Sequence, residues 1–443
     1  MVKPIYINNS ISKFNKKIFI DGDKSLSIRW ALMASQAIGK SRAHNLLRSE
    51  DVKSTMSCLK KLGVKIKWKH NYCEIIGNGL NNFVYKDNLM LNAGNSGTLA
   101  RLILPLLIKS PKKIKIIGDK SLSKRDMRRV IAPLEEFGAT FFPKKKKNLP
   151  IYIQGSNFIR PIKYTELKGS AQVKSCVMLA ALNAPGKTII KARRSRDHSE
   201  ILFRYLKIPI NIKREKNFDL IEVTGKQNYK GFNYKIPSDI SSGAFFIVLT
   251  LLAKNSSLII KNCSINKSRT GVIKILNKMG AKIFFKNKQK YKGEEIADIY
   301  VKSAKSLKGI KCPSKFNSCA IDEFLIIFLA AARAKGISYF SQLHELNLKE
   351  SRRLDWGSKI LNMIGVKTKL TNHSIKIYGQ PNLKLTKKYE IKNYLKDHRV
   401  MAMSTIAALT LGGKWIIHDP NSINTSFPSF FKIIKKDFKI KIN

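Results

Sequence analysis

The chain has 443 residues, a length that exceeds one compact core and favours two domains. Its 84 Lys and Arg against 29 Asp and Glu give a formal net charge of +55, and apolar residues make up 44% of the sequence. No apolar run approaches the ~20 residues of a membrane span, and the N-terminus lacks the apolar core of a signal peptide. We therefore expect a cytoplasmic protein that does not enter a membrane.

The large positive charge could serve a nucleic-acid partner, and this class of function stays an alternative. Against it, lysine is dispersed from end to end, and the one dense run, 144–147, is typical of a solvated turn. No RNP-like aromatic motif, zinc finger or recognition-helix signature accompanies the charge. The six cysteines form no CxxC pair, so we expect buried thiols and no metal site.

One sequence pattern recurs six times along the chain: the end of an amphipathic helix, then a glycine, a small apolar residue and a strand. In chain order the copies read "CLKKLGVKI", "LEEFGATFF", "LFRYLKIPINI", "ILNKMGAKIFF", "ILNMIGVKTKL" and "FKIIKKDFKIKI". Glycine supplies the positive φ that ends many helices. It stands at Gly63, Gly138, Gly280 and Gly365, and its place is taken by Lys207 and Phe438 in the other two copies. A period of about 75 residues suits an α/β unit of two helices and four strands.

Each of the six units also has an earlier helix that is apolar nearly all round and should be buried. These helices are predicted over 27–37, 97–108, 171–182, 242–252, 322–334 and 398–411. The later helix of each unit is amphipathic and should lie outside. The sequence thus predicts an α/β protein with two domains of three units each.

Polar residues gather where the buried helices begin. The first helix follows "DGDKSLSIR", and the others follow or contain "GNSGT", "KGSAQVKS", "PSDISSG", "CAIDEF" and "KDHR". Ser, Asp and Asn are ordinary helix caps. Cations also stand in or beside these first turns: Lys24, Arg29, Arg101, Lys174 and Arg399. Because a cation at a helix start opposes the helix dipole, a bound anion explains these residues better than capping does.

Two of the scarce carboxylates, Asp322 and Glu350, lie beside apolar or cationic neighbours, where a pKa can be tuned for proton transfer. Glu350 belongs to "LKESRRLDW", which precedes the fifth outer helix, and "GDKSLSKRDMRRV" precedes the second.

These motifs, taken in order, resemble the enolpyruvyl transferases and, among them, the EPSP synthase family. The resemblance runs from about Phe19 to Pro428 through "GDKSLSIR", "GNSGTLAR", "GDKSLSKRDM", "GSAQVKS", "SRDHSE", "DISSGAFF", "RTGVIKIL", "IDEF", "LKESRRLD", "DHRVMAM" and "TSFP". The strings "SAQVKS" and "SRDHSE" are more similar to the second class of the family, found in many bacteria. Each motif is weak alone, and their common order makes the signal specific.

The resemblance implies a fold of two domains, each built from three βαβαββ units around buried helices as an inside-out α/β barrel, that close on substrates like a clamp. The chain would cross between the domains near Gly22 and Pro237. One domain would then hold residues 1–22 and 238–443, and the other residues 23–237.

The activity that the resemblance implies is transfer of the carboxyvinyl group of phosphoenolpyruvate to the 5-hydroxyl of shikimate 3-phosphate, with release of phosphate. The chemistry is addition followed by elimination through a tetrahedral ketal, which requires general acids and bases. Both substrates are polyanions, and no metal or cofactor is needed. The resemblance also implies a monomer in the shikimate pathway, without a specific nucleic-acid partner.

Matching the family motifs position by position assigns the expected roles. Proton transfer falls to Asp322, near the 5-hydroxyl, to Glu350, at C3 of phosphoenolpyruvate, and to Lys24. Shikimate 3-phosphate would be bound by Lys24, Ser25, Arg29, Ser170, Ala171, Gln172, Ser195, Arg196, Asp322 and Lys349. Phosphoenolpyruvate would be bound by Lys24, Gly97, Arg125, Gln172, Arg353 and Arg399.

Three positions depart from the family pattern: Asp126 replaces a usual proline, Arg352 a usual aspartate, and Thr425 the lysine of the first class. The nearest alternative is the sister enzyme UDP-N-acetylglucosamine 1-carboxyvinyltransferase. Its first motif has Lys-Asn where this chain has Lys24-Ser25, and none of the six cysteines lies in a loop that matches its reactive cysteine. A noncatalytic remnant is the third alternative, and the retained charged motif residues argue against it.

Overall fold

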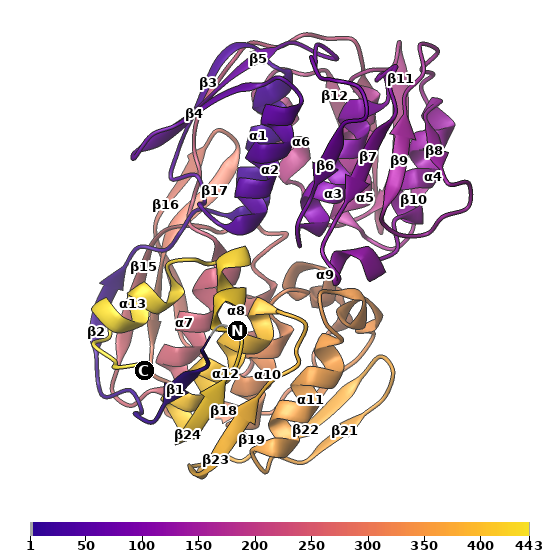
Figure 1. Ribbon diagram of the computed structural model, residues 1–443. Helices are drawn as coiled ribbons and strands as arrows, with labels where there is room; N and C mark the ends of the chain where they lie inside the picture. Colours follow the sequence, from indigo (N-terminus) through magenta and orange to yellow (C-terminus); the bar gives the residue numbers. More distant parts are fainter. Residues whose placement is uncertain (1–2, 443) are drawn as a thin grey trace. The chain divides into compact units, whose positions relative to one another are not determined.

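The computed structural model describes residues 3–442, and the chain folds into two compact units (Figure 1). The inserted unit, as we call it, comprises Gly22–Ile236 together with the hairpin tip Tyr291–Glu294. The composite unit comprises 3–21, Pro237–Lys290 and 295–442.

The inserted unit contains three four-stranded sheets with the bonded orders β14-β3-β5-β4, β6-β7-β9-β8 and β10-β11-β13-β12. In each sheet the first two strands are parallel and the remaining pairs are antiparallel. The strands are β3 (Ile38–His44), β4 (Lys65–Trp68), β5 (Tyr72–Asn78), β6 (Met90–Asn92), β7 (Ile114–Ile117), β8 (Thr140–Phe142), β9 (Ile151–Gln154), β10 (Lys163–Glu166), β11 (Lys187–Arg193), β12 (Ile210–Arg214), β13 (Phe218–Thr224) and β14 (Asn233–Lys235). The helices are α1 (Lys24–Gln36), α2 (Glu50–Lys61), α3 (Gly97–Ile103), α4 (Arg128–Phe137), α5 (Ala171–Ala181) and α6 (His198–Tyr205), with the 3-10 turns η1 (Leu104–Leu107) and η2 (Leu122–Lys124).

The composite unit repeats this plan with sheets of the orders β16-β17-β15-β2, β20-β22-β21 with the short pair β18-β19, and β1-β24-β23. Its strands are β1 (Ile5–Ile7), β2 (Asn15–Ile18), β15 (Ser257–Ser264), β16 (Ile283–Tyr291), β17 (Glu294–Lys302), β18 (Leu307–Lys308), β19 (Ala334–Lys335), β20 (Ile337–Phe340), β21 (Thr368–Leu370), β22 (Ile375–Tyr378), β23 (Leu385–Ile391) and β24 (Gly412–Ile417). Its helices are α7 (Ile240–Leu252), α8 (Gly271–Lys278), α9 (Asn317–Ala320), α10 (Phe324–Ala332), α11 (Arg353–Met363), α12 (His398–Leu411) and α13 (Phe430–Lys436), with η3 (Ser314–Phe316), η4 (His344–Leu348) and η5 (Pro420–Thr425).

In both units the earlier helix of each repeat is buried, as the apolar composition of these segments predicts. In the inserted unit, α3 packs against both α1 and α5; in the composite unit, α7, α10 and α12 pack against one another. Every residue of α10 is buried, whereas α2 buries one face only. The predicted α/β fold with three repeats around buried helices is confirmed.

The helix ends follow the predicted glycine pattern, with one shift. Gly63, Gly138, Gly280 and Gly365 adopt φ of 84°, 117°, 94° and 84°. Lys207 adopts the same left-handed conformation without a glycine, with φ of 58°. In the last copy the left-handed residue is Lys439, not Phe438 as predicted, and the Phe438 side chain is instead buried in the core of its unit.

Three of the predicted helix starts are displaced. The structure begins α1 at Lys24, three residues before the predicted start at Ser27, because Asp23 caps it by accepting a hydrogen bond from Leu26 N. The structure begins α7 at Ile240, two residues before the predicted start, because Asp239 caps it by accepting a hydrogen bond from Ser241 N at 2.8 Å. It begins α10 at Phe324, so Asp322 lies in the turn that joins α9 to α10 and not in the helix itself. This placement leaves Asp322 just before the N-terminus of the buried helix α10.

Candidate active site

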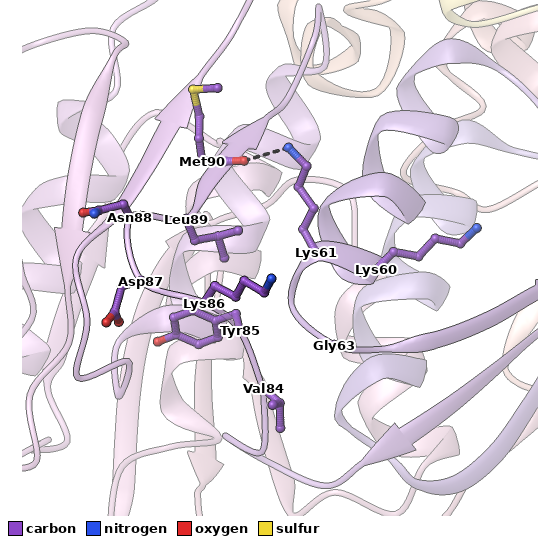
Figure 2. A pocket seen from close by; sticks show the side chains of 10 residues that line it. All are labelled: Lys60, Lys61, Gly63, Val84, Tyr85, Lys86, Asp87, Asn88, Leu89 and Met90. Atoms are coloured by element: carbon purple, nitrogen blue, oxygen red, sulfur yellow. Dashed lines mark hydrogen bonds between the residues drawn. The ribbon is translucent and has the colours of Figure 1, made fainter.

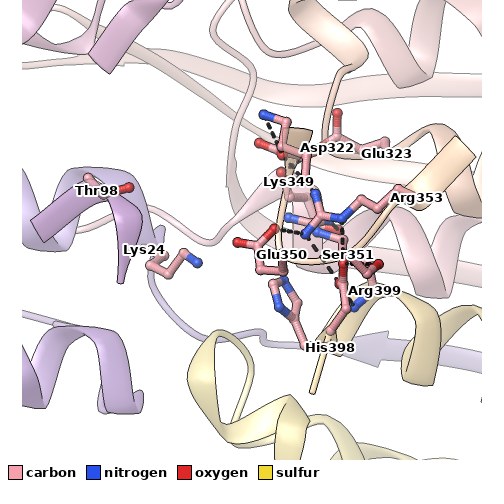
Figure 3. A network of polar contacts seen from close by, with 12 residues as sticks. Lys24, Thr98, Asp322, Glu323, Lys349, Glu350, Ser351, Arg353, His398 and Arg399 are labelled. Atoms are coloured by element: carbon pink, nitrogen blue, oxygen red, sulfur yellow. Dashed lines mark hydrogen bonds and ion pairs between the residues drawn. The ribbon is translucent and has the colours of Figure 1, made fainter. Parts of the chain in front are cut away.

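Arg353, the first residue of α11, is an arginine with only 2% of its side chain exposed, and it is tied to three carboxylates (Figure 3). It donates through Nε to Asp397 Oδ2 at 2.9 Å, through Nη2 to Glu350 Oε2 at 2.5 Å and through Nη1 to Asp322 Oδ1 at 3.3 Å. Burial alone would lower the pKa of Arg353, but the charges of Asp397, Glu350 and Asp322 together raise it above its ordinary value. Arg353 therefore stays charged and gathers three predicted or newly found acids around one centre.

The two predicted proton-transfer acids, Asp322 and Glu350, are brought together here by that shared arginine. Their side chains are 19% and 14% exposed, so both reach solvent and a small ligand can contact them. Lys349 Nζ lies 3.6 Å from Asp322 Oδ1. Neighbouring cations favour the ionised form of a carboxylate, and an ionised carboxylate can accept a proton.

Arg399 lies at the start of α12, where the Asp397 side chain accepts a hydrogen bond from Arg399 N at 2.9 Å. Its guanidinium is 5.7 Å from the Phe245 ring centroid, and its Nη1 donates to Ser241 O at 3.4 Å. The buried Nε of Arg399 has no hydrogen-bond partner within residues 3–442. A buried cation with an open donor at a helix start is suited to an anion.

In the inserted unit, the buried Arg29 is surrounded by serine hydroxyl groups. It donates through Nη1 to Ser25 Oγ at 2.6 Å, through Nη2 to Ser175 Oγ at 2.9 Å and through Nε to Ser199 Oγ at 2.9 Å. The two last hydroxyls are also bonded to each other at 2.7 Å. These bonds hold Ser25 and Arg29, both predicted to bind shikimate 3-phosphate, at one end of α1.

Lys24 is the first residue of α1, and its Nζ lies 3.0 Å from Asp51 Oδ2 in α2. The Lys24 side chain is 20% exposed and that of Asp51 is 6% exposed. Asp23 caps the same helix by accepting a hydrogen bond from Leu26 N at 2.8 Å. The cap and the ion pair fix Lys24 in the first turn, with its side chain partly exposed.

A second group of predicted residues gathers around Gly97, the first residue of α3. A Cβ at Gly97 would lie 2.6 Å from Arg125 Nη1 and 3.0 Å from Arg101 Nη1. Arg101 Nη1 donates to Gln172 Oε1 at 2.7 Å, and Gln172 Nε2 donates to Thr98 Oγ1 at 3.0 Å. Gly97, Arg125 and Gln172 thus lie together with Arg101, so two arginines flank a bare stretch of backbone.

The remaining predicted residues of this unit lie at the starts of α5 and α6. Ser170 caps α5 by accepting from Val173 N at 3.4 Å, and Ala171 is the first residue of that helix. Ser195 and Arg196 precede α6 and are half-buried. The buried Oγ of Ser195 has no hydrogen-bond partner among residues 3–442, a hydroxyl that a ligand oxygen could satisfy.

A sequence profile described as EPSP synthase (3-phosphoshikimate 1-carboxyvinyltransferase) matches residues 8–434. The chain belongs to the EPSP synthase family. This membership confirms the predicted activity, that of a 3-phosphoshikimate 1-carboxyvinyltransferase in the shikimate pathway to aromatic amino acids. Among curated relatives, the 3-phosphoshikimate 1-carboxyvinyltransferase of Caldicellulosiruptor saccharolyticus is 38% identical over 425 residues, 95% of this chain and 96% of the relative. That of Ruthia magnifica is 37% identical over 438 residues, 98% of this chain and 96% of the relative.

Solved structures agree with this membership. EPSP synthase from Acinetobacter baumannii is 33% identical with a TM-score of 0.85, and the match covers 100% of both chains. The enolpyruvyl transferase NikO from Streptomyces tendae has a TM-score of 0.79 at 13% identity over 100% of this chain and 98% of that one, a likeness of fold alone. The sister-enzyme, nucleic-acid and remnant alternatives find no support in these relatives.

Two acids that hold predicted residues of this EPSP synthase were not identified from sequence. Asp397, in the composite unit, holds both Arg353 and the start of α12. In the inserted unit, Glu200 pairs at 2.5 Å with Lys174, which we expected to face an anion, and the two side chains are 4% and 1% exposed. A lysine within an otherwise apolar helix signals that Lys174 needs a partner, but this signal does not name the partner.

The departures from the family pattern are accommodated locally. Asp126 accepts from Arg128 Nη2 at 2.5 Å, and this hydrogen bond lowers the pKa of Asp126, so its charge is directed at Arg128. Arg352 Nε donates to Asp355 Oδ2 at 2.5 Å on the exposed side of α11. Thr425 Oγ1 donates to Ser422 O at 2.8 Å. Each of the three departing side chains therefore has a hydrogen-bond partner close to it in the chain.

A surface pocket elsewhere in the inserted unit contains none of the predicted site residues (Figure 2). Its one drawn hydrogen bond runs from Lys61 Nζ to Met90 O at 3.1 Å. It is lined by Lys60, Lys61, Gly63, Val84, Tyr85, Lys86, Asp87, Asn88, Leu89 and Met90. We therefore do not assign it to the reaction.

Within residues 3–442, no group of three or more His, Cys, Asp or Glu side chains is placed to hold a metal ion. No helix in the same range is long and apolar enough to cross a membrane. Burial raises the pKa of the Cys58 and Cys73 thiols to about 12, so neither thiol is an activated nucleophile.

Proposed function

We propose that Asp322 and Glu350 are the groups that move protons in the carboxyvinyl transfer. In the addition step, Asp322 accepts the proton of the 5-hydroxyl of shikimate 3-phosphate, while the oxygen of that hydroxyl attacks C2 of phosphoenolpyruvate. C3 gains a proton that Glu350 carries into the step, and Glu350 takes a proton back from C3 as phosphate leaves. The proton held by Asp322 passes to the departing phosphate, so both carboxyl groups return to their starting states. The support is geometric: both carboxylates are partly exposed and share Arg353.

Lys24 is proposed to contact both substrates and to assist proton transfer; its support is a partly exposed, cationic side chain in the first turn of α1. Shikimate 3-phosphate is proposed to bind through Lys24, Ser25, Arg29, Ser170, Ala171, Gln172, Ser195, Arg196, Asp322 and Lys349. The buried unpartnered hydroxyl of Ser195 and the serine-ringed Arg29 support this assignment. Charge-assisted hydrogen bonds of this type are the strong ones for phosphate.

Phosphoenolpyruvate is proposed to bind through Lys24, Gly97, Arg125, Gln172, Arg353 and Arg399. The open donor of Arg399 and the bare backbone at Gly97 support this assignment. Arg353 is fully engaged by carboxylates in this structure, so binding the substrate requires it to release Glu350 or Asp322 in part. Such an exchange would free a carboxylate for proton transfer at the moment that substrate arrives.

The class within the family, the location, the oligomeric state and the absence of a cofactor belong to the same proposal. The motifs "SAQVKS" and "SRDHSE" support the second class of the family, with Ala171 where the first class has serine. We infer a cytoplasmic monomer that needs no cofactor.

The assay that tests this function is phosphate release by the purified protein. We expect phosphate from phosphoenolpyruvate only when shikimate 3-phosphate is also present. UDP-N-acetylglucosamine should not replace it. Folded protein that released no phosphate with either acceptor would refute the proposal, and tight binding to DNA with a steep salt dependence would then favour the nucleic-acid alternative.

The bare backbone at Gly97 leads to a sharper prediction. Gly97→Ala places a Cβ 2.6 Å from Arg125 Nη1, so the guanidinium must move away from phosphoenolpyruvate. We expect KM for phosphoenolpyruvate to rise about 10- to 100-fold, because the substrate loses one charge-assisted hydrogen bond. KM for shikimate 3-phosphate should stay nearly constant. Steady-state kinetics with each substrate varied in turn measures both values.

The matched control for Gly97→Ala is the double variant with Arg125→Ala. If the added methyl group acts through Arg125, the two effects on KM are not additive, because the second change removes the group that the first displaces. Additive effects, or an unchanged KM for phosphoenolpyruvate in Gly97→Ala, would remove Arg125 from the substrate site.

A further inference from the structure

The motif "RTG" at 269–271, which the proposed mechanism does not use, contains a third buried arginine of the composite unit, after Arg353 and Arg399. The Arg269 side chain is 2% exposed. Its Nη2 donates to Ser241 Oγ at 2.7 Å and to Asp239 Oδ1 at 3.2 Å, both at the start of α7. A buried arginine is retained only when its charge and donors are matched, so the segment that precedes α8 is fixed to the start of α7.

From Ser241 the network continues toward the proposed reaction centre. The Ser241 hydroxyl donates to Glu323 Oε1, and its carbonyl oxygen accepts from Arg399 Nη1 at 3.4 Å. Glu323 is 1% exposed and directly follows Asp322 in the chain. Figure 3 shows Glu323 directed away from the Arg353 cluster in which Asp322 takes part. Adjacent residues of one turn are thus held by different groups, Asp322 by Arg353 and Glu323 by the Ser241 hydroxyl that Arg269 also contacts.

Gly271 constrains the same turn by having no side chain. A Cβ at this position would lie 2.6 Å from Cys319 C, 2.7 Å from Cys319 O and 2.8 Å from the Ala320 Cβ. These are backbone atoms and a Cβ, which cannot move aside as a flexible side chain can. The first residue of α8 is therefore in direct contact with the turn that leads into Asp322.

We propose that Arg269, Gly271, Ser241 and Glu323, together called the Arg269 brace, are positioning residues that fix Asp322 for proton transfer. The brace holds the turn from two sides, through the Glu323 side chain after Asp322 and through the Cys319–Ala320 backbone before it. A displacement of about 1 Å at a reacting group can reduce a rate about 10²-fold, so such a brace has a measurable effect. This inference rests on the proposed role of Asp322.

The test uses two variants that perturb the brace at different points, Ser241→Ala and Gly271→Ala. For both, we expect kcat to fall about 10- to 100-fold while KM for each substrate changes less than about threefold, because the brace orients a proton acceptor and does not bind substrate. The control is Ser404→Ala, which removes another buried hydroxyl of the unit, one that donates to Val400 O at 2.9 Å within its own helix, and should retain kcat. Thermal unfolding of all three variants separates this effect from a loss of folding.

Rescue by a conservative change provides a second readout at the far end of the brace. Glu323→Ala should lower kcat as Ser241→Ala does, whereas Glu323→Gln should recover most of it, because a glutamine oxygen still accepts the Ser241 hydroxyl. A purely structural role would lower the melting temperature and leave the kcat of the remaining folded enzyme unchanged.

The failure of this inference and the failure of the proposed function give different results. If Asp322→Asn itself keeps normal kcat, the proposed function of Asp322 fails and the brace has nothing to position. If Asp322→Asn is inactive while Ser241→Ala, Gly271→Ala and Glu323→Ala all keep normal kcat, the brace is overturned alone. An equal loss of kcat in Ser404→Ala would also overturn it.

Discussion

Replacing Asp322 with alanine is expected to lower kcat by about 10²- to 10⁴-fold, the usual contribution of a positioned general base. The carboxylate is the proposed acceptor of the 5-hydroxyl proton, and alanine leaves no group to replace it. KM should change little by comparison, because Arg353 keeps its bonds to Asp397 and Glu350. Single-turnover phosphate release, compared with equilibrium binding of shikimate 3-phosphate, separates the chemical step from affinity.

The matched control for this prediction is Asp126→Ala. Asp126 is also an aspartate beside an arginine, but it is bonded to Arg128 and is 42% exposed. Its removal should leave kcat within about threefold of the starting enzyme. Equal losses in the two variants would show that Asp322 has no special role in proton transfer.

Replacing Glu200 with glutamine is expected to destabilise the inserted unit by about 3–5 kcal/mol, since it leaves the buried Lys174 ammonium without a counter-charge. The pair joins α5 to α6, so the loss should also loosen the start of α5, where Ala171 and Gln172 lie. Urea unfolding followed by circular dichroism gives the change in free energy of unfolding.

Two further variants make the Glu200 result interpretable. Glu222→Gln breaks an ion pair between Glu222 and Lys187, whose side chains are 34% and 65% exposed respectively. This change should lower the free energy of unfolding by less than about 1 kcal/mol. Replacing both Lys174 and Glu200 with apolar residues of similar size should recover most of the stability, because no buried charge then remains. A Glu200→Gln protein as stable as Glu222→Gln would show that water or other groups already neutralise Lys174.

The features of the fold that could be predicted from sequence depend on local chemistry. A glycine after an amphipathic helix needs no distant partner, so the four glycine repeat ends were found at the residues that adopt left-handed φ, and the fifth end, at Lys207, was also placed correctly. The last end was misplaced by one residue because Phe438 is apolar enough to be drawn into the core, and the left-handed turn falls on Lys439 instead. Apolar composition likewise identified the buried helices without reference to what covers them.

The candidate site was predictable in part only, because the choice of partner is a tertiary property. Sequence motifs could name Arg353 and Asp322, but nothing local indicates that Asp397, more than 40 positions later, would bind both Arg353 and the start of α12. The same holds for Arg269, whose motif was visible and whose partner Ser241 lies in an earlier helix. The start of α10 was misplaced for a related reason, since Asp322 is held by Arg353 outside the helix.

The way in which each unit closes its sheets has a consequence for biosynthesis. The first sheet of the inserted unit is completed by β14, and the last segment of the unit along the chain is the hairpin tip Tyr291–Glu294. This unit can therefore finish folding while more than a hundred residues remain to be translated. The composite unit cannot do the same, because β1 pairs with β24 through Ile5 and Ile417, and β2 pairs with β15 (Figure 1). β2 must wait until β15 has been made, and β1 until β24 has been made, and such distant pairings form slowly. On the ribosome, the inserted unit would fold first, and β1 would stay unpaired until the ribosome has passed residue 417.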